Sequence, residues 1–358
     1  MSAFAKQTFN AAGYAAARPS YPPALFEHVM AYLDQAIPRG PGPRTLLDLG
    51  CGPGLSTFDW LPHRRFDRIQ AIDPSSGMIS AANGILSERR KAGSVPGNVD
   101  LQFHVARADA LPADVVADES VDLAVAGQAA HWFDASATYA ELARVLKPGG
   151  AFAFWGYGEF YFPTRPELSA LVPPYSAGTL GPYWEQPGRS IVEALLTPFP
   201  FPAGNLSPPF NPGSFTRSFF LRAPAETESK ALPFRIEGLA PDAPEGDYTL
   251  PPPPPAPSAS SSPSPSSVPR TTPRTVHLHR SGSLLKRHWT RAQLVAYLRT
   301  WSAAHAYNEQ RGATGAGGSD CVDAFMDRLE QAGFQLDEGR GETIEVAWDV
   351  GAILGRKQ

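Results

Sequence analysis

The residues of this chain whose types and spacing best suit ligand chemistry lie between Arg44 and Ser80. An apolar run stops at a glycine-rich turn, Gly50 to Gly54, and a second apolar run ends on Asp73. Glycines allow a tight turn and let a ligand lie against bare main chain. An acid at the tip of the second strand can accept hydrogen bonds from ribose hydroxyls. The spacing therefore predicts strand, glycine turn, helix, strand and acid, which together suit a ligand that contains a ribose.

Two classes of cofactor use this arrangement, and the spacing of the glycines distinguishes them. Dinucleotide-binding enzymes favour G-x-G-x-x-G, with the pyrophosphate at the N-terminus of the following helix. In this chain the third glycine, Gly54, comes one position early, and Asp48 stands two residues before the turn. The D-x-G-x-G-x-G pattern instead resembles motif I of class I S-adenosylmethionine (SAM) methyltransferases. That resemblance implies that Asp73 holds the ribose and Met78 lies against the adenine. The residues it implies for the cofactor here are Asp48, Gly50, Cys51, Gly52, Asp73, Pro74 and Met78.

Two later segments add polar and aromatic groups at the ends of predicted strands. A strand over residues 101–105 leads to Ala108 and Asp109, which the resemblance places near the adenine amino group. The residues alone also allow Asp109 to be a helix cap or a solvated turn residue. An apolar strand over residues 120–126 is followed by Gln128, His131 and Trp132. Ligands lie at the carboxyl ends of strands in open α/β sheets, so we expect these three side chains at the site.

Composition and charge limit the class of the protein. The chain has 358 residues, enough for one large domain or two ordinary ones. Its formal net charge of −4 gives no reason to expect nucleic acid or an acidic membrane as the main partner. The two cysteines, Cys51 and Cys321, have no spacing typical of a disulfide framework or a metal site, so no metal is expected. The first residues lack the apolar core of a secretory signal, and no run of about 18 apolar residues occurs. We therefore expect a cytoplasmic protein that is monomeric or weakly dimeric.

The order of the elements predicts an α/β fold. Five strand–helix alternations within the first 156 residues favour a doubly wound, mainly parallel sheet. Two closing strands, at 333–336 and 343–354, would complete a seven-stranded Rossmann-like sheet. Helices are expected at 22–30, 76–92, 134–146, 189–196, 290–303 and 320–331, and the fifth strand at 151–156.

The remaining sequence defines the domain organisation. Residues 157–250 are rich in aromatic residues and proline, and we interpret them as a helical and aromatic lid inserted into one domain. From Pro251 to Pro273, ten of the 38 prolines of the chain occur, mostly among serines. Such a stretch has almost nothing to bury and is expected to be disordered. The expected division is an N-terminal helical flap (1–43), a cofactor-binding core (44–156), the lid (157–250), the Pro/Ser-rich loop (251–282), and C-terminal helices with closing strands (283–358).

Six segments carry a more specific resemblance. They are LLDLGCGPGLST, AIDPSSGMI, SVDLAVAGQAAHWFD, ELARVLKPGGAFAFWGYG, GPYWE and LVAYLRTWSA. The first four are shared by many class I methyltransferases, and A-H-W-F-D with Y-L-R-T-W-S narrows the match. On these residues the chain resembles the trans-aconitate methyltransferase-like enzymes, a fungal small-molecule group with a type 11 methyltransferase domain. The resemblance implies SAM as cofactor and a small-molecule acceptor. The chain departs from the group in its Pro/Ser-rich insertion and at Ala126-Gly127, where a bulkier residue or serine is usual.

The same resemblance implies site residues outside these motifs. Many small-molecule methyltransferases begin with Y-x-x-x-R-P-x-Y-P, which starts here at Tyr14 and would form a flap over the cofactor. It implies that Tyr14 and Arg18 bind SAM and that Tyr21 contacts the acceptor. From the residues alone, the segment is equally a surface arm with scattered aromatic side chains. The other residues expected against the acceptor are Trp132, Trp155, Trp184 and Trp301.

The atom that receives the methyl group stays open at this stage. A carboxylate, which the resemblance favours, is ionised at pH 7 and needs no general base, but it needs cations or hydroxyl donors to hold it. Candidates for that role are Tyr183, Trp184, Arg165, Arg189, Arg299 and Trp301. A hydroxyl, phenol or amine acceptor, as in a secondary metabolite, would benefit from a base, and His131 is suited to that task. The same histidine could instead hold Trp132 in place.

Other classes of function share part of the pattern. A nicotinamide-dependent oxidoreductase would use the same strand, turn and acid, but the third glycine is misplaced for it and no catalytic Tyr/Lys or Ser constellation occurs. A non-catalytic SAM-binding protein has only the basic insertion in its favour. A nucleic-acid methyltransferase would usually carry N/D-P-P-Y/F or a catalytic cysteine after the fourth strand, where this chain has G-Q-A-A-H-W. We therefore expect a small-molecule partner, with no nucleic acid and no membrane.

Overall fold

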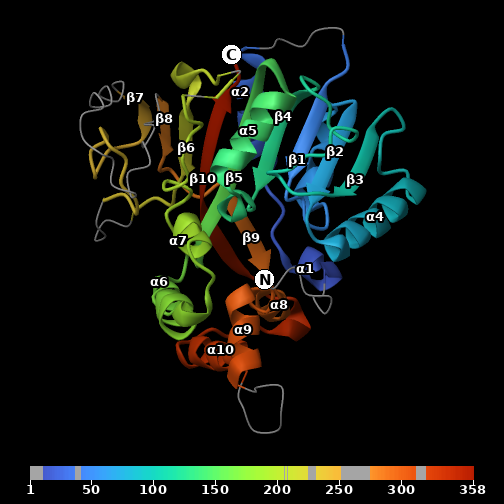
Figure 1. The fold of residues 1–358 in the computed structure, drawn as a ribbon. Coiled ribbons are helices and arrows are strands. Elements are labelled where there is room, and N and C mark those ends of the chain that lie inside the picture. The colour runs from blue at the N-terminus through green and yellow to red at the C-terminus, as the bar shows by residue number, and fades with distance from the viewer. Residues whose placement is uncertain are drawn as a thin grey trace.

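A computed structural model describes residues 11–36, 42–204, 206–207, 209–224, 231–250, 275–311 and 320–358. Within them, one sheet runs through the molecule and helices cover both of its faces (Figure 1). The strands are β1 (Thr45–Leu49), β2 (Arg68–Asp73), β3 (Asp100–Val105), β4 (Val121–Gly127), β5 (Leu146–Tyr161), β6 (Thr216–Phe220), β7 (Gly246–Thr249), β8 (Thr275–His279), β9 (Leu285–Trp289) and β10 (Ile344–Arg356). The predicted loop at 251–273 lies outside the described residues.

The α-helices alternate with these strands in the first half and cluster near the C-terminus. They are α1 (Ala11–Ala17), α2 (Pro23–Asp34), α3 (Leu55–Asp59), α4 (Ser76–Lys91), α5 (Ala135–Val145), α6 (Pro166–Ser169), α7 (Gly188–Glu193), α8 (Arg291–Leu298), α9 (Ser302–Arg311) and α10 (Cys321–Gln331). Short 3-10 or π turns are η2 (Leu61–His63), η3 (Ala130–Trp132), η4 (Pro174–Thr179), η5 (Gly181–Tyr183), η6 (Pro212–Ser214) and η7 (Glu338–Arg340).

The strand order of the sheet is β3-β2-β1-β4-β5-β10-β6-β8-β7, and β9 also pairs with β10. Strands β1 to β5 are parallel, as the strand–helix alternation predicts. Strand β10 is antiparallel to β5, β6 and β9, and β7 is antiparallel to β8. The sheet therefore has ten strands and is mixed, so the prediction of seven strands is wrong. Of the additional strands, β6, β7 and β8 come from the middle of the chain, and β9 comes from the start of the segment 283–358.

The expected ends of several elements also need correction. Strand β5 begins at Leu146 and continues to Tyr161, past the expected end at Gly156, because β10 pairs with it as far as Tyr161. The expected strand at 333–336 does not form, so of the two expected closing strands only the second is present, as β10. The helix expected over 290–303 ends at Leu298, and α9 begins separately at Ser302.

The segments that we expected to be a lid and a disordered loop also contribute to the sheet. Residues 157–250 supply β6 and β7, and residues 251–282 supply β8. All five residues of β6 are buried between β10 and β8, which explains why so short a run is stably paired. The middle of the chain is thus partly a lateral extension of the sheet rather than only a cover for the site.

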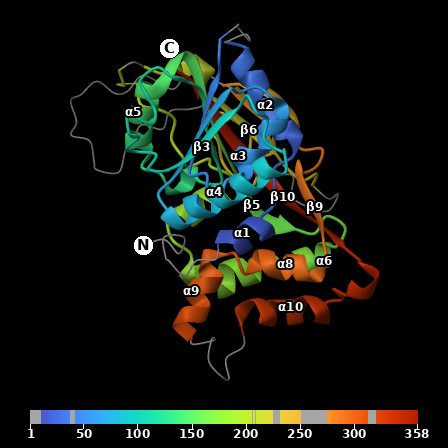
Figure 2. The same cartoon turned by 90° about the vertical axis from the view of Figure 1, so that its right-hand side faces the viewer.

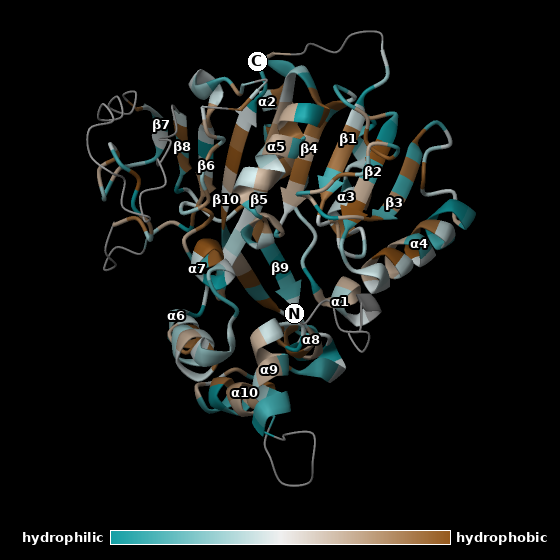
Figure 3. Ribbon diagram, viewed as in Figure 1, coloured by the Kyte–Doolittle hydropathy of each residue, from teal (hydrophilic) through white to brown (hydrophobic). Residues whose placement is uncertain are grey.

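The two faces of the sheet bury separate hydrophobic clusters, as a doubly wound fold requires. On β1, Leu46 packs in the cluster with residues of α2 and α4, whereas Leu47 packs in the cluster with α5. Figure 2 shows α5 on one side of the sheet and α2 on the other. Figure 3 shows that hydrophobic residues concentrate on the central strands, while β9 is mostly hydrophilic. The carboxyl ends of β1, β2 and β4 are thereby held at one edge, facing α1 and α8.

Gly351 in the middle of β10 leaves space for a neighbouring loop. An added Cβ would lie 2.3 Å from the carbonyl oxygen of Leu195, so the backbone must move to accept a side chain. We expect Gly351→Ala to lower the free energy of unfolding by about 1–3 kcal/mol, the usual cost of overpacking. Urea denaturation measures this free energy, and Gly84→Ala, measured in the same way, is the control. Gly84 lies inside α4 with nothing near its would-be Cβ, so alanine should stabilise by about 0.5–1 kcal/mol. Equal stability of the two variants would contradict this packing argument.

Candidate functional site

The turn after β1 presents bare backbone to a cavity. Gly50 has φ 67°, and an added Cβ would stand 2.6 Å from the Cβ of Ala129 in the loop after β4. Gly52 has φ 55°, and nothing lies within 4 Å of the place where its Cβ would be. A side chain is therefore excluded at Gly50 and would project into open space at Gly52. Both glycines line the cavity, as the motif predicts.

Asp73 stands at the end of β2 and faces the same turn. Its Oδ2 accepts a hydrogen bond from the backbone N–H of Gly52 at 3.0 Å, and its Oδ1 accepts one from Ser75 at 2.8 Å. Burial raises the pKa of Asp73, which these two backbone hydrogen bonds oppose. A carboxylate oxygen can accept more than one hydrogen bond, so both oxygens keep capacity for a ligand. The carboxylate is thus held in a fixed position at the wall of the cavity, where it can accept hydrogen bonds from a ligand.

Asp48 is buried beneath the turn and does not line the cavity, so its predicted contact with the cofactor is not what the structure shows. Its Oδ2 accepts hydrogen bonds from the hydroxyls of Thr57 at 2.6 Å and Ser56 at 3.2 Å, both on α3. Burial raises the pKa of Asp48 to about 7, although these hydrogen bonds act to lower it. Asp48 therefore ties α3 to β1 and shapes the glycine turn from below.

The loop after β3 supplies the next wall of the cavity. Ala108 and Asp109 both line it, together with Met78 of α4, whose side chain is buried. The Asp109 carboxylate accepts hydrogen bonds from Nε and Nη2 of Arg107, at 2.8 and 2.6 Å, and Arg107 lowers its pKa. The acid is thus already paired, and the backbone of this loop remains available to a ligand.

Gln128 connects two strands at the edge of the cavity. It has φ 56°, and its side-chain Oε1 accepts a hydrogen bond from the N–H of Tyr157 at 2.8 Å. Its Nε2 donates to the carbonyl of Tyr157 at 3.1 Å. The amide is therefore used to hold the end of β5 beside the end of β4. Gln128 lines the cavity, and its main effect there is to fix the position of Tyr157.

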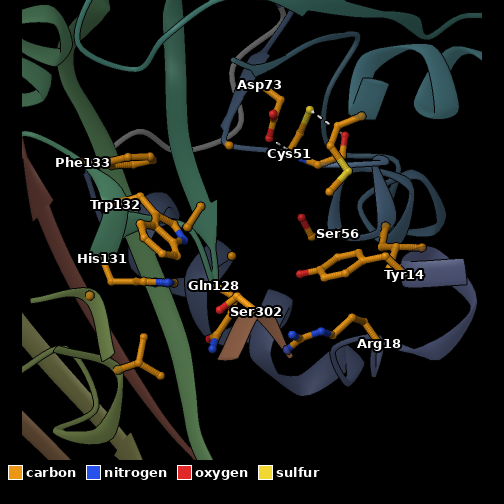
Figure 4. Close-up of a pocket in the computed structure, with 18 of the residues that line it drawn as sticks. Tyr14, Arg18, Cys51, Ser56, Asp73, Gln128, His131, Trp132, Phe133 and Ser302 are labelled. Atoms are coloured by element: carbon orange, nitrogen blue, oxygen red, sulfur yellow. Dashed lines mark hydrogen bonds between the residues drawn. The ribbon is translucent and has the colours of Figure 1, made fainter. Parts of the chain in front are cut away.

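His131 and Trp132 project from η3 into the cavity, and Figure 4 shows both rings on the side opposite Tyr14 and Arg18. Their ring centroids are 4.9 Å apart. Burial, and secondarily the positive charge of Arg18, lowers the pKa of His131 to about 3. Nδ1 of His131 is buried without a hydrogen-bond partner within the described residues. The ring is therefore neutral at physiological pH, and Trp132 keeps 41% of its surface exposed.

The N-terminal segment closes the cavity from the other side. Nη1 of Arg18 donates a hydrogen bond to the Tyr157 hydroxyl at 2.9 Å, and the guanidinium lies 4.9 Å from the ring centre of Tyr14. In the described part of the chain Arg18 has no carboxylate partner, and its buried Nε has no hydrogen-bond partner. Tyr21 also lines the cavity, so the expected flap does reach the site.

Most of the predicted site residues lie around this one cavity of about 490 Å³. They are Tyr14, Arg18, Tyr21, Gly50, Cys51, Gly52, Asp73, Pro74, Met78, Ala108, Asp109, Gln128, His131, Trp132, Trp184 and Trp301. Trp155 does not line it and is fully buried in the core, with its ring 5.5 Å from that of Tyr21 and 6.1 Å from that of Phe26. The prediction that Trp155 contacts a substrate is therefore not supported by its position.

Of the three arginines considered for binding an acidic acceptor, one lines the cavity and two do not. Arg165 and Arg299 do not line the cavity, and each pairs with acids elsewhere, Glu167 and Asp323 respectively. Arg189 does line it, but its guanidinium pairs with two acids, Glu159 and Glu193. The structure thus removes two of the three arginine candidates and leaves the third already neutralised.

The shape and polarity of the cavity fit SAM. A nucleoside can lie against the bare backbone of Gly50 and Gly52 with its ribose at Asp73, and Met78 bounds the space where the base would lie. At the other end, Arg18 is a buried cation that no described acid neutralises, so it suits the carboxylate of the amino-acid part of SAM.

Residues 47–154 match the family model of the methyltransferase domain, which covers the glycine turn, Asp73 and the strands to β5. The probable S-adenosylmethionine-dependent methyltransferase CRG1 of Saccharomyces cerevisiae is 30% identical over 193 residues, 53% of this chain and 61% of that protein. The methyltransferase pgmE of Aspergillus terreus is 28% identical over 162 residues, 45% of each chain. The chain thus matches less than two thirds of the length of these relatives.

The fold has a counterpart among solved structures. A protein of Anaeromyxobacter dehalogenans, proposed to be a type II methyltransferase, superposes over 95% of this chain and 97% of its own, with a TM-score of 0.54 and 23% identity. This likeness shows a Rossmann-like methyltransferase fold. Residues 47–154 of the chain are therefore similar to a methyltransferase domain, and a SAM-dependent methyltransferase is among the relatives they resemble.

Several residues that line this cavity were not expected from the sequence. They include Tyr157, Glu159, Glu185, Gly188, Tyr297 and Ser302. Tyr157 and Glu159 lie on the part of β5 beyond Gly156, where the sequence suggested that the strand had ended. If β5 had been predicted to extend to Tyr161, the alternation of side chains along a strand would have placed Tyr157 and Glu159 on the same face of the sheet, toward the site.

Two absences apply only to the part of the chain that the structure describes. No group of three or more His, Cys, Asp or Glu side chains there is arranged to hold a metal ion. No described helix is both long and apolar enough to cross a membrane. The oligomeric state and the cytoplasmic location stay predictions.

Proposed function

We propose that this protein is a SAM-dependent methyltransferase that acts on a small molecule. One observation carries the proposal: the glycine turn, Asp73 and Arg18, which no acid among the described residues neutralises, meet around one cavity. The matched domain and the named relatives support the methyltransferase part of this proposal. A cavity bounded by aromatic rings at its far end also suits a small acceptor better than a polymer.

The residues of the chain bind and align rather than supply the reactive group. When bound, SAM supplies an electrophilic methyl on its sulfonium. We assign Asp73 to the ribose hydroxyls, Met78 and the backbone near Ala108 to the adenine, and Arg18 to the amino-acid carboxylate. Holding an acceptor atom in line at near-attack distance can contribute roughly 7–11 kcal/mol to lowering the barrier. Tyr157 is hydrogen-bonded to both Arg18 and Gln128, so it fixes the position of Arg18 relative to the loop after β4.

The two acceptor chemistries predicted from the sequence are supported unequally. A carboxylate acceptor needs a free cation, and Arg165 and Arg299 lie outside the cavity while Arg189 is already paired. A phenol or hydroxyl needs a base, and His131 with a pKa of about 3 is a weak one. A phenol has a pKa near 10, so moving its proton to such a base is uphill by on the order of 10 kcal/mol. An acceptor that needs neither a free cation nor a strong base fits best.

Calorimetric titration of the purified protein with SAM, and separately with NADH, tests the proposed cofactor. We expect SAM to bind in the micromolar range and NADH to give no heat of binding, because the third glycine is misplaced for a pyrophosphate. Transfer of labelled methyl from SAM to small molecules would then test catalysis. Binding of NADH alone would refute the proposal, and SAM binding without transfer to any small-molecule class would favour a non-catalytic SAM-binding protein.

A further inference from the structure

The half of the cavity away from Asp73 is walled by acids and aromatic rings. Glu159 stands near the end of β5, and Glu185 stands just before α7; both line the cavity. Glu185 has no ion pair within the described residues. Trp132 and Trp184 lie on the same side of the cavity as α7. This end therefore offers negative charge and the faces of aromatic rings.

Arg189 is the only arginine on this wall among the described residues, and two carboxylates pair with its guanidinium. Nη2 of Arg189 pairs with Glu159 at 2.9 Å, and its Nε pairs with Glu193 at 2.7 Å. Its guanidinium also lies 4.3 Å from the ring centre of Trp184, and only 10% of its side chain is exposed. The group of Glu159, Arg189 and Glu193 carries a net charge of −1, with Glu193 outside the cavity lining, and Glu185 adds a second negative charge at the wall itself. A carboxylic acid entering here would meet like charges without a free cation.

Two other arginines line the cavity: Arg107 pairs with Asp109, and Arg18 is committed in the proposed function to the carboxylate of SAM. On that basis, we infer that the acceptor is an amine, bound between Glu159, Glu185 and the tryptophan rings, and not a free carboxylic acid. Carboxylates attract an ammonium group, and aromatic faces also attract a cation that lies over them. An anion at the same place would be repelled, and like charges in contact are strongly disfavoured.

The charge changes of the reaction fit these surroundings. The bound ammonium group first loses a proton to water at the exposed side of the cavity, beside Glu185. The lone pair that this leaves on nitrogen forms the new bond to the methyl carbon while the sulfur–methyl bond breaks, and the electron pair of that bond stays on sulfur. Positive charge thus moves onto the nitrogen, where Glu159 and Glu185 stabilise it as it develops. The product is a methylammonium that keeps its charge, so the one proton released overall is the one that water takes before the transfer. His131 is not required as a base, which agrees with its neutral, buried ring.

Matched pairs of amines and acids on the same ring provide the test. The protein is saturated with S-adenosylhomocysteine, so that no turnover occurs, and titrated calorimetrically with tryptamine and indole-3-propionate, then with benzylamine and phenylacetate. We expect each amine to bind at least about tenfold more tightly than its acid partner. Because Glu185 is exposed, Glu185→Gln should weaken the amines by up to about fivefold, as for an exposed ion pair, and should not weaken the acids. Glu88→Gln, an exposed substitution on α4, provides the control.

The outcomes separate this inference from the proposed function. If S-adenosylhomocysteine itself fails to bind, the proposed function fails. If it binds, the inference is overturned by tighter binding of the acids, by failure of all the amines, or by an amine preference that Glu185→Gln leaves unchanged. Amine preference that Glu185→Gln reduces and Glu88→Gln does not would support it, as would transfer of labelled methyl to the amine nitrogen.

Discussion

Replacing Asp73 with alanine should weaken SAM binding by about a hundredfold or more while the protein stays folded. A hydrogen bond to a charged group contributes about 1.5–3 kcal/mol, and the carboxylate can accept two from the ribose hydroxyls. Each 1.4 kcal/mol corresponds to a factor of about ten in affinity. Calorimetric titration with SAM measures the change directly.

The structure makes the control for this substitution important. Asp73 also accepts hydrogen bonds from Gly52 and Ser75, so alanine loosens the turn as well as removing the ligand contact. Asp73→Asn keeps the size and one acceptor oxygen, and it should lie between alanine and wild type. Asp100→Ala, at the opposite end of the neighbouring strand and exposed, should bind SAM normally. Unchanged SAM affinity in a folded Asp73→Ala protein would disprove the ribose assignment.

The first half of the fold was predictable because each of its strands is both apolar and regular. Strands β1 and β4 are buried almost throughout, and β4 is followed by a clear helix start, in which Asp134 caps α5. By contrast, β9 carries Lys286, Arg287 and His288 between its buried ends. Its pairing depends on β10, more than fifty residues later in the chain, so no local pattern could indicate it. Long-range pairing of this kind overrides local propensity.

The candidate site was predictable where chemistry depends on backbone, and less so where it depends on side-chain direction. The glycine turn and Asp73 follow from spacing alone. Trp155 was expected in the site because it stands near the apparent end of a strand. The strand in fact continues, so Trp155 packs in the core and Tyr157, two residues further on, reaches the cavity. The ion pairs of Arg189 likewise depend on tertiary contacts, which decide whether a cation is free to bind a ligand.

Acid should destabilise the protein through His28, by about 3 kcal/mol between pH 6.5 and 4. Burial, and then the nearby rings of His277 and His279, lowers the pKa of His28 from 6.5 to about 4, although Asp247 opposes this. Its Nε2 is hydrogen-bonded to the Ser218 hydroxyl at 2.8 Å. Because the folded pKa is below the unfolded one, the unfolded chain binds more protons in this range. The contribution to stability is therefore complete above pH 6.5 and is lost as the pH falls toward 4. Each pH unit by which the folded and unfolded pKa values differ corresponds to about 1.4 kcal/mol of stability, which gives the figure of about 3 kcal/mol.

The pH dependence of the wild-type protein alone cannot isolate this effect, because buried acids act in the opposite direction. The pKa of Asp48 is raised to about 7 and that of Asp59 to about 6, mainly by burial, and these raised pKa values favour the folded state at low pH. The measurement is therefore urea denaturation of wild type and His28→Gln from pH 7.5 to 4.5. The stability advantage of wild type should shrink by most of about 3 kcal/mol across that range. His288→Gln, at an exposed position on β9, should leave the pH dependence unchanged. Parallel curves for wild type and His28→Gln would mean that His28 titrates alike in the folded and unfolded chains and has no part in acid unfolding.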